Sequence, residues 1–275
     1  MTLLVWALAV LTTTWPSKAP APPAGSARLG ELARAVLSAD YRGNRPELLF
    51  LDGELAKLPD GPLSEYRDYW RGFARWRRAI NGFNENPTPE DLQSDVENAI
   101  ARFRAALERH PDWIEARLAL AGCWGNLIYV AGKDEAKRKA ILEEASSTFR
   151  WVMEYTGDNP RALWIRGGYE LWAANNAPPP KVGDFEKPAA TFRQALEGAR
   201  KEAIANPDAP AWVPTWGGPE NLMNLAYMYS RGPKPDRAAA IAYAEGALVS
   251  APQWHYVGDV LLPQIETMPV ASAAP

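Results

Sequence analysis

Residues 99–111 read Ala-Ile-Ala-Arg-Phe-Arg-Ala-Ala-Leu-Glu-Arg-His-Pro, and this stretch decides the fold. Its spacing of small residues and a final proline returns at Ala240, Ala244, Ala247 and Pro252. Both copies continue as Pro-x-Trp and then enter another segment whose apolar residues recur at helical spacing. A match that covers a helix end, a turn and the next helix start indicates a repeated unit built from two helices.

The repeated unit resembles the tetratricopeptide repeat. The first helix of such a unit has a large residue, then Leu and a small residue three and four places on, then an aromatic residue after three more. Segments of this kind begin at Tyr69, Arg117, Leu163 and Leu222, and the last one fits at all four positions. The resemblance covers roughly residues 65–265 and implies an all-α superhelix, a solenoid of helical hairpins with inserted loops.

The second helix of each unit is predicted over residues 91–110, 137–155, 186–205 and 236–250. Small residues in these helices let two helices approach, and an aromatic residue fills the groove that remains, as in the pairs Ala99 with Phe103 and Phe192 with Ala195. This packing role makes the pattern structural rather than catalytic. Thr88, followed by Pro89, is expected to cap the first of these helices.

The sequence divides into four predicted parts. These are a signal peptide with a Pro/Ala-rich leader (1–26), an N-terminal helix pair (27–62), the repeat domain (63–268) and a disordered tail (269–275). A last apolar helix over residues 256–265 is expected to cap the repeats. Extra residues at 84–90, 130–134 and 175–184 all fall between the two helices of a unit, so they must lie along one edge of the solenoid. The tryptophan-containing stretch 206–219 is expected to be a packed loop.

Residues 3–11 form an apolar run of signal-peptide length, which predicts export to the periplasm or the extracellular space. Because no Lys or Arg follows Met1 in this region, an uncleaved anchor and a misassigned start codon stay as alternatives. Nine apolar residues are too few to span a bilayer, which needs about 20. No transmembrane span is expected after the signal.

The composition is typical of a globular chain, and the sequence lacks the common catalytic motifs. The 275 residues are 47% hydrophobic and 23% charged, with net charge −3, so no nucleic-acid partner is expected. The single cysteine, Cys123, is expected to be a small buried hydrophobe, and His110 and His255 are expected to be structural. No HExxH, GxSxG, Walker-type loop, CxxC or SxxK motif is present. We therefore predict no catalytic residue, no metal and no cofactor.

The family resemblance also implies a binding surface, because the first helix of each unit lines the concave groove. Arginine suits carboxylates, so the arginines around Trp70 and Trp76 predict an acidic peptide or chain terminus; the alternative is a solvated face over a buried aromatic stripe. Carried over residue by residue, the resemblance places partner contacts at Arg67, Trp70, Arg77, Arg78, Leu118, Asn126, Trp164, Trp172, Met223, Tyr227 and Arg231.

Three functional hypotheses follow. The first is a non-enzymatic scaffold that binds a protein or peptide partner through its groove or its inserted edge. The second is a helical component of an envelope transport system that binds a small apolar or aromatic solute, because the third unit is rich in tryptophan. The third is a hydrolase or lyase on a helical toroid, which needs carboxylates, or a carboxylate with His255, to converge in one cavity.

Overall fold

We describe the fold from a computed structural model, over residues 23, 25–85, 87–177 and 184–269. The predicted signal peptide and most of the predicted tail lie outside these residues. Within them all regular structure is helical. The elements are α1 (Ser26–Tyr41), α2 (Arg45–Ala56), α3 (Ser64–Gly82), α4 (Leu92–Arg109), α5 (Ile114–Ala131), α6 (Glu135–Glu154), α7 (Pro160–Asn175), α8 (Glu186–Ala205), α9 (Gly218–Arg231), α10 (Arg237–Ser250), a π-helical turn (Tyr256–Leu261) and α11 (Leu262–Glu266).

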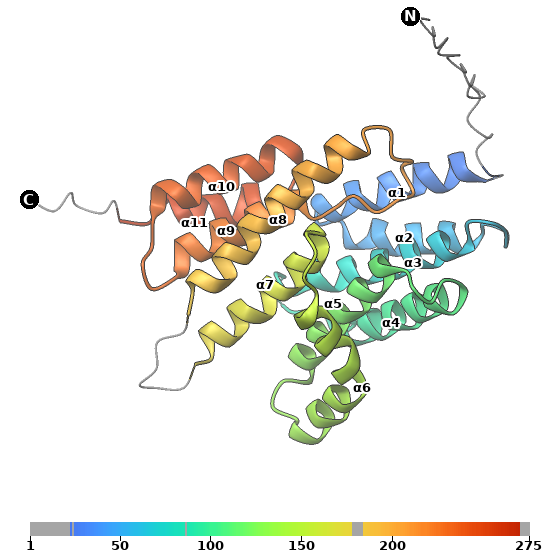
Figure 1. Ribbon diagram of the computed structural model, residues 1–275, viewed down its shortest axis with the longest axis horizontal. Helices are drawn as coiled ribbons and strands as arrows, with labels where there is room; N and C mark the ends of the chain where they lie inside the picture. Colours follow the sequence, from blue (N-terminus) through green and yellow to red (C-terminus); the bar gives the residue numbers. More distant parts are fainter. Residues whose placement is uncertain (1–22, 24, 86, 178–183, 270–275) are drawn as a thin grey trace, which may run out of the picture.

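Consecutive helices pack against each other along the chain, which gives the predicted all-α superhelical arrangement (Figure 1). Contacts between helices two apart in the order join α3 to α5, α5 to α7 and α7 to α9. These four helices therefore form an inner layer, and α4, α6, α8 and α10 form the outer layer. In the described part of the chain, none of the helices has the length and apolar character needed to cross a membrane.

Close approach within a unit depends on two glycines of the inner helices. A Cβ atom added at Gly72 of α3 would lie 2.9 Å from the Phe103 ring of α4, and one added at Gly167 of α7 would lie 2.4 Å from the Phe192 ring of α8. Both phenylalanines are fully buried. The predicted pairing of a small residue with an aromatic one is therefore the contact that joins the two helices of a unit.

We expect Gly167→Ala to lower the free energy of unfolding by about 1–3 kcal/mol, because the new methyl group overlaps the Phe192 ring. Its neighbour Gly168 is the matched control, because a Cβ there has no atom within 4 Å. Gly168→Ala should leave stability unchanged or raise it by up to about 1 kcal/mol, since alanine favours the helix. Urea denaturation of both variants measures this, and equal losses would contradict the packing argument.

Side-chain caps fix where several helices begin. The Asp134 carboxylate accepts a hydrogen bond from the backbone N–H of Lys137 at 2.9 Å, and α6 starts two residues earlier than predicted. The Asn159 side chain caps α7 just before Pro160. The prediction that Thr88 caps the first outer helix is wrong, because α4 begins only at Leu92.

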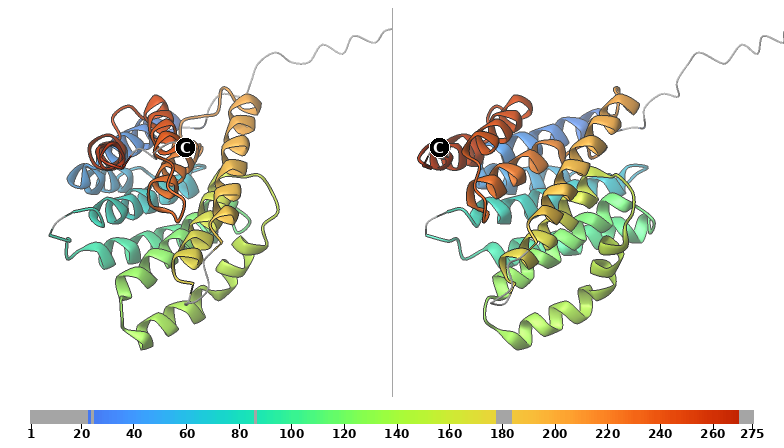
Figure 2. Two further views of the ribbon diagram at one scale, coloured as in Figure 1. Left: turned by 90° about the vertical axis from the view of Figure 1, so that its left-hand side faces the viewer. Right: turned by 60° about the vertical axis from the view of Figure 1, so that its left-hand side comes forward.

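Helix α1 contacts the last repeat unit, so the two ends of the described superhelix meet (Figure 2). The Tyr41 hydroxyl donates to Glu220 of α9 at 3.0 Å, and its ring lies 5.0 Å from the ring of Trp254. The Gln253 amide donates to the Ser38 hydroxyl at 2.9 Å. Helices α1 and α2, at the positions of the predicted N-terminal pair, both pack on α3, and α1 also contacts α9 and the residues after α10.

A buried ionic cluster lies behind this contact. Arg77 of α3 donates to the Asp40 carboxylate at 2.7 Å, and Asp40, Arg77 and Glu220 are each at most 3% exposed. Burial raises the pKa of Glu220, although Arg77 and the N–H of Gly217 act in the opposite direction. Two buried carboxylates thus lie near one guanidinium; Asn81 also donates to Asp40, and Tyr41 and the backbone N–H of Gly217 donate to Glu220.

The Glu220 carboxyl should make stability fall as the pH rises. A group whose native pKa is raised contributes stability that is fully present below its unfolded value of 4.5 and is lost as the pH passes the native pKa. We expect Glu220→Gln to remove this part of the loss as the pH rises above 4.5, measured by urea denaturation at several pH values. Glu143→Gln, at an exposed glutamate of α6, is the control. If the wild-type and Glu220→Gln profiles ran parallel, Glu220 would not be the source.

Candidate binding surface

The segment between α8 and α9, residues 206–217, which we call the inner segment, fills the inner face of the superhelix with its last residues, around Trp212 and Trp216. Its Trp216 is 2% exposed and donates from Nε1 to the hydroxyl of buried Tyr69 at 2.8 Å. The Trp216 ring lies 5.5–5.8 Å from the rings of Phe73, Trp76 and Trp164, on α3 and α7. The predicted packed loop therefore occupies the surface that the family resemblance assigns to a partner.

Side chains of the inner helices also bind the backbone of this segment. Trp70 Nε1 donates to the carbonyl oxygen of Trp212 at 2.7 Å, and Arg161 Nη1 donates to the carbonyl oxygen of Trp216 at 2.9 Å. Arg161 is 2% exposed and forms ion pairs with Glu115 and Glu202 at 2.5 and 2.6 Å. The inner segment is thus held by hydrogen bonds as well as by apolar packing.

Three of the predicted partner contacts are buried. Trp70 and Leu118 are fully buried, and Arg77 is 3% exposed and paired with Asp40. Their predicted exposure in an open groove is wrong: the inner segment covers Trp70, α1 covers Arg77, and Leu118 lies in the apolar core. None of the three is available to a partner in this structure.

The arginines of α3 are neutralised by carboxylates of the same chain. Asp52 of α2 accepts from Arg71 and Arg75 at 2.9 and 2.6 Å. Asp95 of α4 pairs with Arg75 and Arg78. Burial opposes ionisation of Asp91, but hydrogen bonds from Arg45 and Arg78 hold the pKa of Asp91 below its ordinary value. These cations are therefore neither a solvated face nor an open site for an acidic chain.

Arg67 and Asn126 also have internal partners. Arg67 donates to the carbonyl oxygen of Leu58 at 3.0 Å and to Asp60 at 2.8 Å. The Asn126 side-chain oxygen accepts from Trp76 Nε1 at 2.7 Å. Both residues are partly buried, so they stabilise the repeat array in this structure.

The remaining predicted contacts divide between the protein interior and the surface. Met223 and Tyr227 of α9 are partly buried against the C-terminal apolar cluster, and Arg231 lies over the Tyr227 ring at 4.9 Å. Trp164 is partly buried among the inner aromatic rings. Trp172, by contrast, is 59% exposed near the end of α7. The structure does not gather these residues into one hollow.

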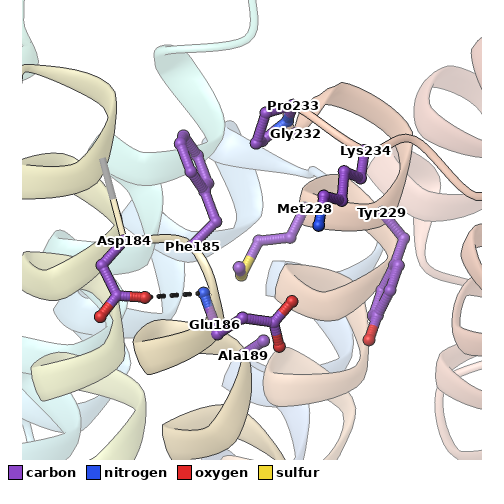
Figure 3. Close-up of a pocket in the computed structure, with 9 residues that line it drawn as sticks. All are labelled: Asp184, Phe185, Glu186, Ala189, Met228, Tyr229, Gly232, Pro233 and Lys234. Carbon is purple, nitrogen blue, oxygen red and sulfur yellow. Dashed lines mark hydrogen bonds between the residues drawn. The ribbon is translucent and has the colours of Figure 1, made fainter. Parts of the chain in front are cut away.

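A cleft of about 310 Å³ opens instead where α8 begins and α9 ends, and we call it the edge cleft (Figure 3). In Figure 1 the end of α7, the start of α8 and the turn from α9 to α10 lie together on the left-hand side. The cleft therefore lies on the edge where the sequence places the inserted residues. Its lining residues are Asp184, Phe185, Glu186, Ala189, Met228, Tyr229, Gly232, Pro233 and Lys234.

The floor of the edge cleft is apolar and its mouth is charged. Ala189 and Met228 belong to a small buried cluster with Phe192 and Leu225, which joins α8 to α9. Figure 3 shows Lys234 reaching over the mouth from the α9–α10 turn. None of the lining residues is among the predicted partner contacts; the sequence signal that points to this site is the recurrence of inserted residues at one place in the unit.

No family model, curated protein or solved structure matches this chain. Among the described residues, no group of three or more His, Cys, Asp or Glu side chains is arranged to hold a metal ion. His110 stacks on Trp113 and His255 pairs with Asp259 at 2.7 Å. Cys123 is buried, and burial raises the pKa of its thiol.

If Trp216 fixes the inner segment, its removal should cost far more than removal of an exposed tryptophan. We expect Trp216→Ala to lower the free energy of unfolding by about 3–5 kcal/mol, because it leaves a cavity among aromatic rings. Trp172→Ala is the control and should change it by less than about 0.5 kcal/mol, because that side chain is largely in solvent. Chemical denaturation decides the matter, and similar values for the two variants would contradict this account.

Proposed function

We propose that this protein is an exported, non-enzymatic scaffold of the tetratricopeptide type that binds a protein partner through its inserted edge. One observation carries the proposal. The inner face is filled by Trp216 and its neighbours, whereas an apolar-floored cleft with charged residues at its mouth opens on the edge. Such a cleft suits an apolar side chain that anchors a partner, with charges around it to select which partner binds.

The location of the cleft supports this role. It lies between two repeat units, so both walls are helix ends fixed by the packing of α8 on α9. Phe185 and Pro233 stand on opposite sides of the cleft in Figure 3, each just outside a helix. A partner's side chain inserted there would rest on the packed floor between α8 and α9. It would also contact turn residues, whose identity does not determine the packing of the repeats.

The experiment is affinity capture from the native envelope fraction with the mature protein as bait. We expect one partner that wild type recovers reproducibly and Lys234→Glu does not, because the substitution reverses the charge at the mouth of the cleft. Lys139→Glu makes the same charge change on α6, where the side chain is 80% exposed, and should retain that partner. Loss of the partner with both variants, or with neither, would count against the edge cleft.

A second candidate function is the binding of a small apolar solute. The cleft volume of about 310 Å³ is at the lower end of the range of small-molecule sites, which is about 300–1,000 Å³. A solute would fit the apolar floor without any partner chain. The two proposed functions differ in what fills the cleft: a free small molecule, or a side chain that belongs to a protein partner.

A further inference from the structure

The charged side chains that line the edge cleft differ in whether they have hydrogen-bond or ion-pair partners. The Asp184 carboxylate accepts from the backbone N–H groups of Glu186 and Lys187 at 3.1 and 3.2 Å, so it caps the start of α8. The Glu186 carboxylate lies 3.9 Å from the Arg193 guanidinium. Lys234 forms no ion pair with any residue that the structure describes. Among the charged side chains that line the cleft, Lys234 is the one without a hydrogen-bond or ion-pair partner in the described part of the chain.

The floor sets the second requirement for an occupant. Met228 is 7% exposed and lies with Ala189 at the bottom, and Phe185 and Pro233 form the sides. An aliphatic or aromatic side chain buried there leaves water at roughly 25 cal/mol per Å² of apolar surface. The cleft of about 310 Å³ has room for a bulky side chain.

On the basis of the proposed function, we infer that the edge cleft recognises a protein segment in which a bulky apolar residue is adjacent to an acidic one. The apolar side chain occupies the floor over Met228, and the neighbouring carboxylate pairs with the Lys234 ammonium group at the mouth. Glu186 faces the same space and repels a second carboxylate (Figure 3). The site thus discriminates by charge at its mouth and by size at its floor.

A methyl NMR titration tests this ligand class directly. The protein has five methionines, and the Met228 methyl resonance, assigned from a Met228→Leu variant, reports on the floor of the cleft. The probes are hexapeptides with acetylated and amidated ends, Gly-Ser-Leu-Glu-Ser-Gly and its counterparts with Gln or Lys in place of Glu and with Ala in place of Leu. We expect a saturable shift of Met228 with the Leu-Glu peptide and a shift at least several-fold weaker with the Ala-Glu peptide.

Reversing the charge at Lys234 and in the peptide distinguishes direct recognition from a structural defect of the variant. An exposed ion pair contributes about threefold in affinity. Wild type should therefore bind the Leu-Glu peptide about threefold more tightly than the Leu-Gln peptide, and Lys234→Gln should bind the two peptides with equal affinity. Lys234→Glu should prefer the Leu-Lys peptide, and Glu186→Gln should bind the Leu-Glu peptide at least as well as wild type. A structural defect would weaken every peptide equally and could not reverse a preference.

Three results would overturn the inference. Equal affinity for the Leu-Glu, Leu-Gln and Leu-Lys peptides would remove the role of Lys234. Saturation by 4-methylpentanoate, with no response to any peptide, would show a site for a free solute. If no probe shifts Met228 while capture still depends on Lys234, the ligand class is wrong but the proposed scaffold function stands.

Discussion

The position of the Trp216 ring is the contact on which the rest of this structure depends. Helical repeats of this kind curve around an inner face, and here that face holds a tryptophan contributed by the chain itself. Its indole N–H reaches the Tyr69 hydroxyl, and its carbonyl oxygen accepts from Arg161. Because α3 and α7 both contact this one ring, the curvature of the inner layer is fixed by an intramolecular contact rather than by a bound partner.

The ionic structure of α3 follows from the same constraint. A helix that is covered by α1, α2, α4 and the inner segment has almost no face left for water, so its arginines need acidic partners from neighbouring helices. Asp52 and Asp95 are each at most 5% exposed and each accept from two arginines. Removal of one partner from such a set leaves a buried charge, which costs much more than the pair itself contributes. These residues are therefore structural.

The sequence predicted the helices and their pairing because both depend on short-range spacing. The small and aromatic positions, such as Gly72 and Phe103, are a local signal for a helix contact, and the contact forms. The sequence could not predict that Trp216 would fill the inner face, because its hydrogen bond to Tyr69 joins residues 147 positions apart. The family resemblance assumes an open groove, so Trp70, Arg77 and Leu118 were placed at a partner surface although they are buried.

The sequence could predict the edge on which the cleft lies, but not the residues that line it. Inserted residues at one place in the unit indicated an edge, but the lining comes from two units, with Phe185 at the start of α8 and Lys234 beyond the end of α9. No single segment carries that combination. The floor is part of the apolar contact between the helices, whereas the mouth consists of turn residues that the contact does not need. The floor residues thus hold the two units together, while the turn residues at the mouth are free to select a partner. A binding role at the edge is therefore compatible with an inner face that is filled by the chain itself.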